Sequence, residues 1–111
     1  MKIIFKATHI DLTPSIKTYV DEKIGSLGRY LQRIEAGGEV TATVEIGRTT
    51  HHHHKGDVFR AEVNMPLPGK MLRAEHVARD MRAAIDRVRN TLRLKITKYR
   101  AVHLVRRILR R

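Results

Sequence analysis

The sequence of 111 residues contains no cysteine and no long apolar run. Without cysteine, neither a disulfide framework nor a thiolate metal site can form. A membrane-spanning helix needs roughly 18 apolar residues in a row, and no stretch approaches that length. The first residues alternate and carry charge, so they lack the apolar centre of a signal peptide. We therefore expect one domain with a cytoplasmic location and no membrane partner.

Acidic residues are nearly absent from the last third of the chain. Residues 70–111 contain 14 Lys and Arg against Glu75, Asp80 and Asp86, and no acidic residue follows Asp86. This segment therefore holds most of the net charge of +12. Clustered positive charge is typical of proteins that bind a polyanion, because each neutralised phosphate releases condensed counterions. The pattern predicts a nucleic-acid partner, although a basic face kept for solubility would carry the same charge.

Hydrophobic periodicity predicts six elements. Alternation predicts strands over residues 2–8, 40–46, 58–65 and 71–75. Apolar residues at spacings of three and four predict helices over residues 14–34 and from residue 78 to beyond residue 99. Thr13 and Pro14 are typical of a helix start, whereas Gly25 and Gly28 weaken the helix that follows. The order β-α-β-β-β-α predicts an α+β fold, a four-stranded sheet with two helices packed on one face.

The predicted elements divide the basic residues between two faces. On the last helix, Arg79, Arg82, Arg89, Arg93 and Arg100 are predicted to form an arc beside the apolar stripe. The sheet face away from the helices is predicted to carry Lys2, Lys6, Arg60 and Arg73 and to face solvent. Glu45 and Glu62 are expected to pair with these arginines across the strands.

Several segments resemble ribosome hibernation-promoting factors: residues 10–14 (IDLTP), 19–23 (YVDEK) and 69–75 (GKMLRAE). The most specific is DMRAAID at residues 80–86, because family members carry a similar Asp-Met-x-Ala-Ala-Ile-Asp. Lys98, Tyr99 and Arg100 resemble the basic end of the same helix. The last helix departs from the family, with Thr91, Leu94 and Thr97 where many members carry Lys or Arg.

The resemblance covers residues 1–100 and implies the same β-α-β-β-β-α fold. It implies a translation silencer that occupies the decoding region of the small ribosomal subunit, blocks messenger and transfer RNA, and preserves idle ribosomes. The implied partners are the small subunit and its rRNA, with no small-molecule substrate and a monomer away from the ribosome. Residues 101–111 are predicted to be a basic amphipathic tail. Long members of the family add a C-terminal dimerisation domain after a linker. This sequence contains no segment that could form one, so it resembles the short form.

Eight basic residues are the candidate RNA contacts, because arginine binds phosphate bidentately and stacks on unpaired bases. They are Lys23, Arg29, Arg79, Arg82, Arg89, Arg93, Lys98 and Arg100. Lys23 and Arg29 fit basic positions of the family's first helix. Each residue is also compatible with plain surface charge, or with a long cation that covers apolar surface.

Two other functions fit part of the sequence. A general double-stranded-RNA-binding module needs the order α-β-β-β-α, which is present from Pro14 onward, but leaves the first strand and residues 80–86 without a role. A metal-dependent regulator would use His51–His54, yet adjacent side chains of an extended loop diverge and no carboxylate pair completes a tetrahedral set. No nucleophile–base pair or phosphate loop is present, so we expect no enzyme, no cofactor and no metal site.

Overall fold

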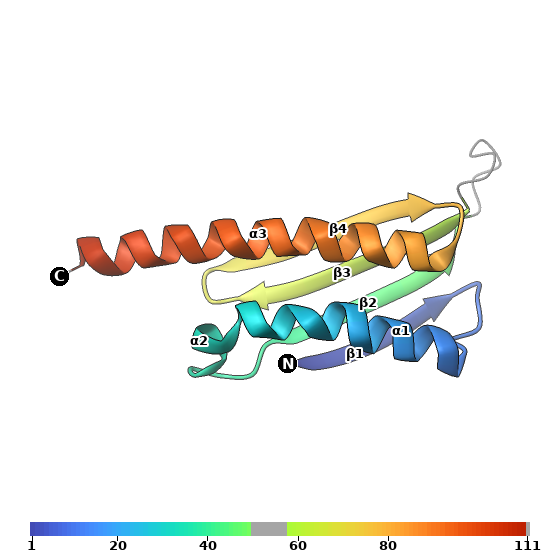
Figure 1. Ribbon diagram of the computed structural model, residues 1–111, viewed down its shortest axis with the longest axis horizontal. Helices are drawn as coiled ribbons and strands as arrows, with labels where there is room; N and C mark the ends of the chain where they lie inside the picture. Colours follow the sequence, from blue (N-terminus) through green and yellow to red (C-terminus); the bar gives the residue numbers. More distant parts are fainter. Residues whose placement is uncertain (50–57, 111) are drawn as a thin grey trace.

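The computed structural model describes residues 1–49 and 58–110. The elements are β1 (Lys2–Thr8), α1 (Pro14–Gly25), the 3₁₀ helix η1 (Ser26–Tyr30), α2 (Gln32–Glu35), β2 (Thr41–Arg48), β3 (Phe59–Leu67), β4 (Lys70–Ala78) and α3 (Met81–Leu109). The sheet order is β1-β2-β3-β4; β1 and β2 are parallel, and the other pairs are antiparallel. Helices α1 and α3 lie over one face of this sheet (Figure 1). The predicted α+β fold is confirmed.

The first helix begins where the sequence predicts but does not continue to residue 34. Thr13 caps it, since its hydroxyl accepts a hydrogen bond from Ile16 N at 3.2 Å. Helix α1 ends at Gly25, and the chain continues as the tighter η1. Two glycines lower the helix propensity here, and the Ser26 hydroxyl donates to the Lys23 carbonyl oxygen, which competes with the helical pattern. The prediction of one unbroken helix was therefore wrong.

The core lies between the helices and the inner sheet face. Val44, Ile46, Val63 and Met65 of the two central strands are fully buried. They belong to one apolar cluster with side chains of α1, η1 and α3, among them Ile24, Leu27, Ile85 and Leu92. None of the polar or charged residues in the described ranges is buried. The apolar alternation and the helical stripes therefore account for the whole core.

Strands β1 and β2 approach closely at one point. Gly47 lies in register with Thr8. A Cβ atom at position 47 would lie 2.7 Å from the Thr8 carbonyl oxygen, which is inside van der Waals contact. Glycine is therefore required at the end of β2 for the parallel pairing to continue.

Helix α3 begins later than predicted and, as predicted, continues beyond residue 99. Strand β4 extends to Ala78 instead of ending near residue 75, so the helix starts only at Met81. Asp80 is its N-cap and accepts a hydrogen bond from Ala83 N at 2.8 Å. Arg79 thus precedes the helix, and its predicted place in the helical arc was wrong. At the other end α3 continues to Leu109 and projects past the sheet (Figure 1). Residues 101–109 of α3 are called the overhang below.

The apolar side of α3 changes direction in the overhang. At about 100° per residue, His103 and Arg110 continue the side on which Ile85 and Leu92 enter the core. Val105 and Ile108 fall on the outer side and are 52% and 60% exposed. The sheet no longer lies beneath this part of the helix, and every described residue after Arg100 is exposed. The overhang therefore adds nothing to the core.

Candidate nucleic-acid interface

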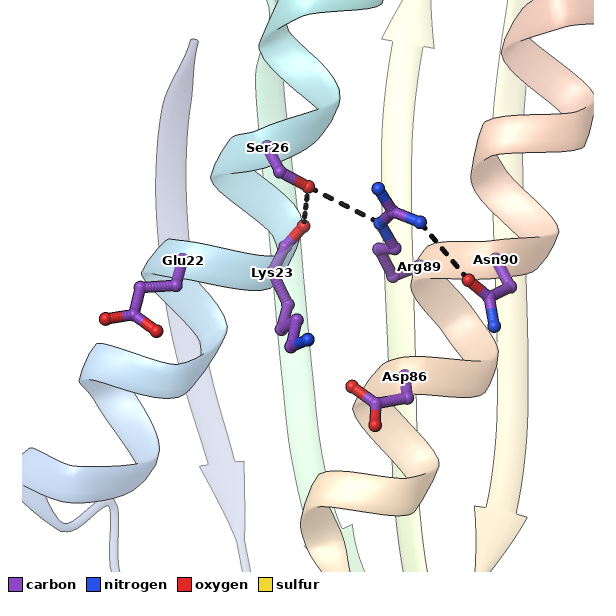
Figure 2. A pocket seen from close by; sticks show the side chains of 6 residues that line it. All are labelled: Glu22, Lys23, Ser26, Asp86, Arg89 and Asn90. Carbon is purple, nitrogen blue, oxygen red and sulfur yellow. Dashed lines mark hydrogen bonds between the residues drawn. The ribbon is translucent and has the colours of Figure 1, made fainter.

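A shallow groove separates α1 from α3 on the side of the molecule away from the sheet. Its walls carry Glu22, Lys23 and Ser26 from α1 and η1, and Asp86, Arg89 and Asn90 from α3 (Figure 2). Arg89 lies across the groove, with Nε donating to Ser26 Oγ at 3.4 Å and Nη1 donating to Asn90 Oδ1 at 3.3 Å. Both contacts are with neutral groups, so the guanidinium charge is directed to the groove without a carboxylate partner among these contacts.

Tyr19 organises the end of the groove nearest the start of α3. The charged groups of Lys23 and Arg82 lie 5.5 Å and 5.1 Å from the centroid of its ring. Its hydroxyl donates to Asp86 Oδ1 at 2.7 Å. This hydrogen bond, followed by burial and the charge of Asp86, raises the pKa of Tyr19 to about 12, although Arg82 acts in the opposite direction. Asp86 therefore joins α1 to α3 and holds the ring that positions two cations.

Six of the eight predicted RNA contacts lie on the face of the molecule that carries the groove. Arg82, Arg89, Arg93 and Arg100 follow one another along one side of α3, at spacings of seven, four and seven residues. Arg82 contacts Ser15 of α1, and Arg89 contacts Ser26 of η1, across the groove. Lys23 and Arg29 come from that facing wall, on α1 and η1. The structure thus brings these six cations together from α1 and η1 on one side and from α3, which is distant in sequence, on the other.

Lys98 and Arg79 are separated from this set. Arg79 lies in the turn between β4 and α3. Lys98 lies on the side of α3 that faces β4, where Arg87 donates to the Val77 carbonyl oxygen and Lys95 donates to the Arg73 carbonyl oxygen. Neither residue shares a surface with Arg89.

The outer face of the sheet carries arginines of a different kind. Glu45, Glu62 and Glu75 face one another in register across β2, β3 and β4. Arg60 pairs with all three carboxylates, at 2.8 Å from Glu75 and 3.7 Å from Glu45. Arg73 pairs with Glu62 at 3.2 Å and with Glu75 at 2.9 Å. The predicted cross-strand pairing is confirmed, and both arginine charges are compensated.

The same network changes the titration of Glu62. Its side chain is only 12% exposed, and this burial alone would raise the pKa. Hydrogen bonds from Arg73 and Asn64, together with the charges of Arg60 and Arg73, outweigh burial and hold the pKa of Glu62 below its usual value. Over β2, β3 and β4 the outer face is therefore an ion-pair network whose arginines already have carboxylate partners.

Two further arginines belong to the helical side and were missed by the sequence analysis. Arg33 on α2 and Arg107 on the overhang line a second cleft with Arg29 and Arg100, here called the distal cleft. Arg107 was assigned to a separate tail, and the position of Arg33 depends on the break in the first helix. The sequence did contain a signal for both, because Arg33 follows Arg29 by four residues and Arg107 follows Arg100 by seven, which are helical spacings.

Other site types find little support in residues 1–49 and 58–110. These ranges contain no group of three His, Asp or Glu side chains placed to hold a metal ion. His51–His54 lie outside the described residues. Asp80 caps a helix and Asp86 binds Tyr19. Within the same ranges, no helix combines the length and the apolar character needed to cross a membrane.

Comparison with known proteins identifies the family of this chain. A family model described as Sigma 54 modulation protein / S30EA ribosomal protein matches residues 3–103. The chain is 34% identical over 100 residues to the ribosome hibernation promotion factor of Lactococcus lactis subsp. cremoris, which covers 90% of this chain and 50% of that protein. It is 36% identical over 86 residues to the ribosome hibernation promoting factor of Acidithiobacillus ferridurans, covering 78% of this chain and 100% of the relative.

A solved structure gives the same result. The crystal structure of the N-terminal domain of Thermus thermophilus Protein Y superposes with a TM-score of 0.71 at 30% identity, covering 89% of this chain and 99% of that one. The chain spans about half the length of the Lactococcus relative. With the family model matching nearly the whole sequence and the fold shared, the chain belongs to the Sigma 54 modulation protein / S30EA ribosomal protein family.

Proposed function

We propose that this protein is a non-enzymatic translation silencer that binds the small ribosomal subunit through its rRNA. In this proposal residues 1–100 form the ribosome-binding domain, occupy the decoding region, exclude messenger and transfer RNA, and preserve idle ribosomes. The names of the relatives, which are ribosome hibernation factors, support the ribosome as target. The observation that carries the proposal is the set of six cations that α1, η1 and α3 assemble on the groove side.

The length of this set favours an extended polyanion over a small anion. Arg82 and Arg100 are 18 residues apart on one helix, which corresponds to about 27 Å at a rise of 1.5 Å per residue. Lys23 and Arg29 run beside them on α1 and η1. A stripe of this length can contact several successive phosphates, and guanidinium groups bind phosphate oxygens bidentately. The side chains of the groove therefore suit a nucleic-acid backbone.

Sedimentation through a sucrose gradient with purified small subunits tests the proposal. Arg89→Gln combined with Arg93→Gln removes two groove charges, and Lys2→Gln combined with Lys6→Gln removes two charges from the outer sheet face. The two double variants have the same net charge. We expect the groove variant to bind at least about tenfold more weakly, and the sheet variant to bind within about twofold of the original protein.

Charge reversal sharpens the result. Arg89→Glu combined with Arg93→Glu should abolish association and relieve inhibition in a cell-free translation assay. The thermal midpoint should move little, because surface changes usually stay within about 0.5 kcal/mol. Equal losses in the two glutamine variants would show that the groove is the wrong face. Displacement from subunits by excess double-stranded RNA of random sequence would instead indicate a general RNA-binding module.

A further inference from the structure

The distal cleft lies between η1 and α2 on one side and the last turns of α3 on the other. Its volume is about 490 Å³, within the range of about 300–1,000 Å³ that is common for small-molecule sites. Four arginines line it, two from each wall: Arg29 and Arg33, and Arg100 and Arg107. No carboxylate is among the described residues that form its walls. The cleft is therefore concave and strongly cationic, whereas the groove between α1 and α3 also contains the carboxylates of Glu22 and Asp86.

Aromatic rings form part of the same cleft. Tyr30 accepts a hydrogen bond from Arg29 Nη2 at 2.8 Å, and the guanidinium carbon lies 4.9 Å from its ring centroid. Tyr99 donates to the Pro68 carbonyl oxygen at 2.7 Å, and its ring stacks on His103 with centroids 5.7 Å apart and planes inclined by 16°. These contacts hold the rings in place before any ligand arrives.

The combination indicates the chemistry of the ligand. Guanidinium groups on both walls suit a phosphate, which they can bind bidentately. Fixed aromatic rings suit a planar base, because every nucleobase can stack on such a ring. An acidic peptide would use the arginines but would leave the rings without a role. Only a ligand that joins an anionic group to a flat ring uses both features.

We propose that the distal cleft is a nucleotide-binding site. The base contacts the rings of Tyr30, Tyr99 and His103, and the phosphate lies among Arg33, Arg100 and Arg107. The nucleotide is either an unpaired residue of RNA or a free nucleotide, since both present the same chemistry. In its RNA form the inference rests on the proposed function, because the cleft then receives a nucleotide of the bound rRNA.

Two neighbouring arginines provide a matched test. Arg106 and Arg107 are both exposed and both belong to the overhang, but only Arg107 lines the cleft. Arg106→Gln and Arg107→Gln change charge and helix propensity equally. Titration of the full chain with adenosine monophosphate and with a single-stranded ten-nucleotide oligoadenylate, followed by calorimetry, gives the affinities. We expect Arg107→Gln to weaken binding by about tenfold, and Arg106→Gln by less than about twofold.

A ring variant tests the second half of the site. Tyr30→Leu keeps an apolar side chain next to the core and should weaken both probes by about tenfold through lost stacking. If only the oligonucleotide binds, the source is RNA; saturable binding of the monophosphate alone identifies a free nucleotide. Equal effects of the two arginine variants, or polyglutamate binding as tightly as either probe, would overturn the proposal.

The result is independent of the ribosome assay. Nucleotide binding that persists in a protein that does not sediment with subunits would refute the proposed function and leave the distal cleft as a nucleotide site. Subunit association that is unchanged by Arg107→Gln, with no saturable binding of either probe, would refute the cleft alone.

Discussion

The molecule has two regions rich in arginine, and they differ in what surrounds the charge. On the outer sheet face, Arg60 and Arg73 lie among three carboxylates. On the groove side, Arg89 contacts only a hydroxyl and an amide. The number of arginines would not separate the two regions, but the position of the carboxylates does. A cation is available to phosphate only where the fold has not already supplied its counterion.

The difference follows from how each element places its acidic residues. Three glutamates lie in register across β2, β3 and β4, where they would repel one another. Arg60 and Arg73 therefore stabilise the sheet by separating like charges. Helix α3 has no acidic residue after Asp86, so the cations that follow have no such task within their own helix. Arg60 and Arg73 therefore serve folding, whereas the groove arginines serve recognition if the proposed function holds.

Salt should have the largest effect, because it weakens binding of the small subunit through the groove side. With about six phosphate contacts, affinity for the small subunit should fall by roughly 10³ between 50 and 200 mM salt, because bound counterions are released on association. Each groove cation changed to glutamine should lower the log–log slope by about one, whereas Lys2→Gln should leave it unchanged. Filter binding over a salt series measures the slope. A slope near zero would contradict the electrostatic model.

A core substitution beneath the groove should lower stability without changing the binding surface. Ile85→Ala removes a fully buried side chain of α3 and should lower the free energy of unfolding by about 2–5 kcal/mol. Urea denaturation measures this loss. Inhibition of translation should fall only in proportion to the unfolded fraction. A larger fall would mean that Ile85 affects the binding surface directly.

Removing the central arginine of the sheet network should weaken folding and spare binding. Arg60→Gln leaves the three glutamates in register with only Arg73 to pair with Glu62 and Glu75, and it should lower the free energy of unfolding by about 1–3 kcal/mol. Arg89→Gln is the matched control, since it should change stability by less than about 0.5 kcal/mol and weaken subunit binding instead. Urea denaturation and sedimentation together give both quantities. The comparison between the two faces fails if the variants behave alike.

The two regions should also lose stability at opposite ends of the pH scale, and these effects should be the smallest. The pKa of Glu62 is below its usual value in the folded state, so its contribution is present at neutral pH and is lost as the pH falls through that pKa. The pKa of Tyr19 is raised from 10.0 to about 12 in the folded state. Its contribution to the free energy of unfolding is therefore fully present below pH 10 and is lost between about pH 10 and 12.

Glu62→Gln should flatten the acidic limb of the unfolding free energy, and Tyr19→Phe should flatten the alkaline limb. Denaturation in urea across the pH range provides the measurement. Ultraviolet titration of phenol ionisation should show Tyr19 ionising near pH 12, a step that Tyr19→Phe removes. An alkaline limb that is unchanged in Tyr19→Phe would show that its hydrogen bond to Asp86 contributes nothing.

The sequence predicted the strands and the core because alternation and burial are local properties of a pleated sheet. It did not predict the break at Gly25, since Leu27 and Leu31 reach the core from η1 as readily as from an α-helix. Arg33 was missed for that reason. The Tyr19–Asp86 bond joins residues 67 positions apart, and no local pattern specifies it.

The candidate contacts were predictable where helical spacing alone decides the side, as for Arg82, Arg89 and Arg100. Lys98 was placed with them because Lys98, Tyr99 and Arg100 resemble the basic end of the family's last helix, although its helical position points it towards β4. Arg79 was misplaced because β4 extends three residues further than its alternation indicated. The misplacement of Arg79 arises from an element boundary, which depends on tertiary contacts more than on local sequence.

Helix α3 is continuous, yet its two ends should unfold differently, one together with the whole domain and the other locally. Amides near Ile85 lie over the sheet and should exchange with solvent only when the whole domain unfolds. The overhang has no sheet beneath it, and a helical segment of about ten residues is marginal alone in water. Its amides should therefore exchange through local fraying from Leu109 inwards. A ligand in the distal cleft would tie this end to η1, and the gradient of protection along α3 would become shallower.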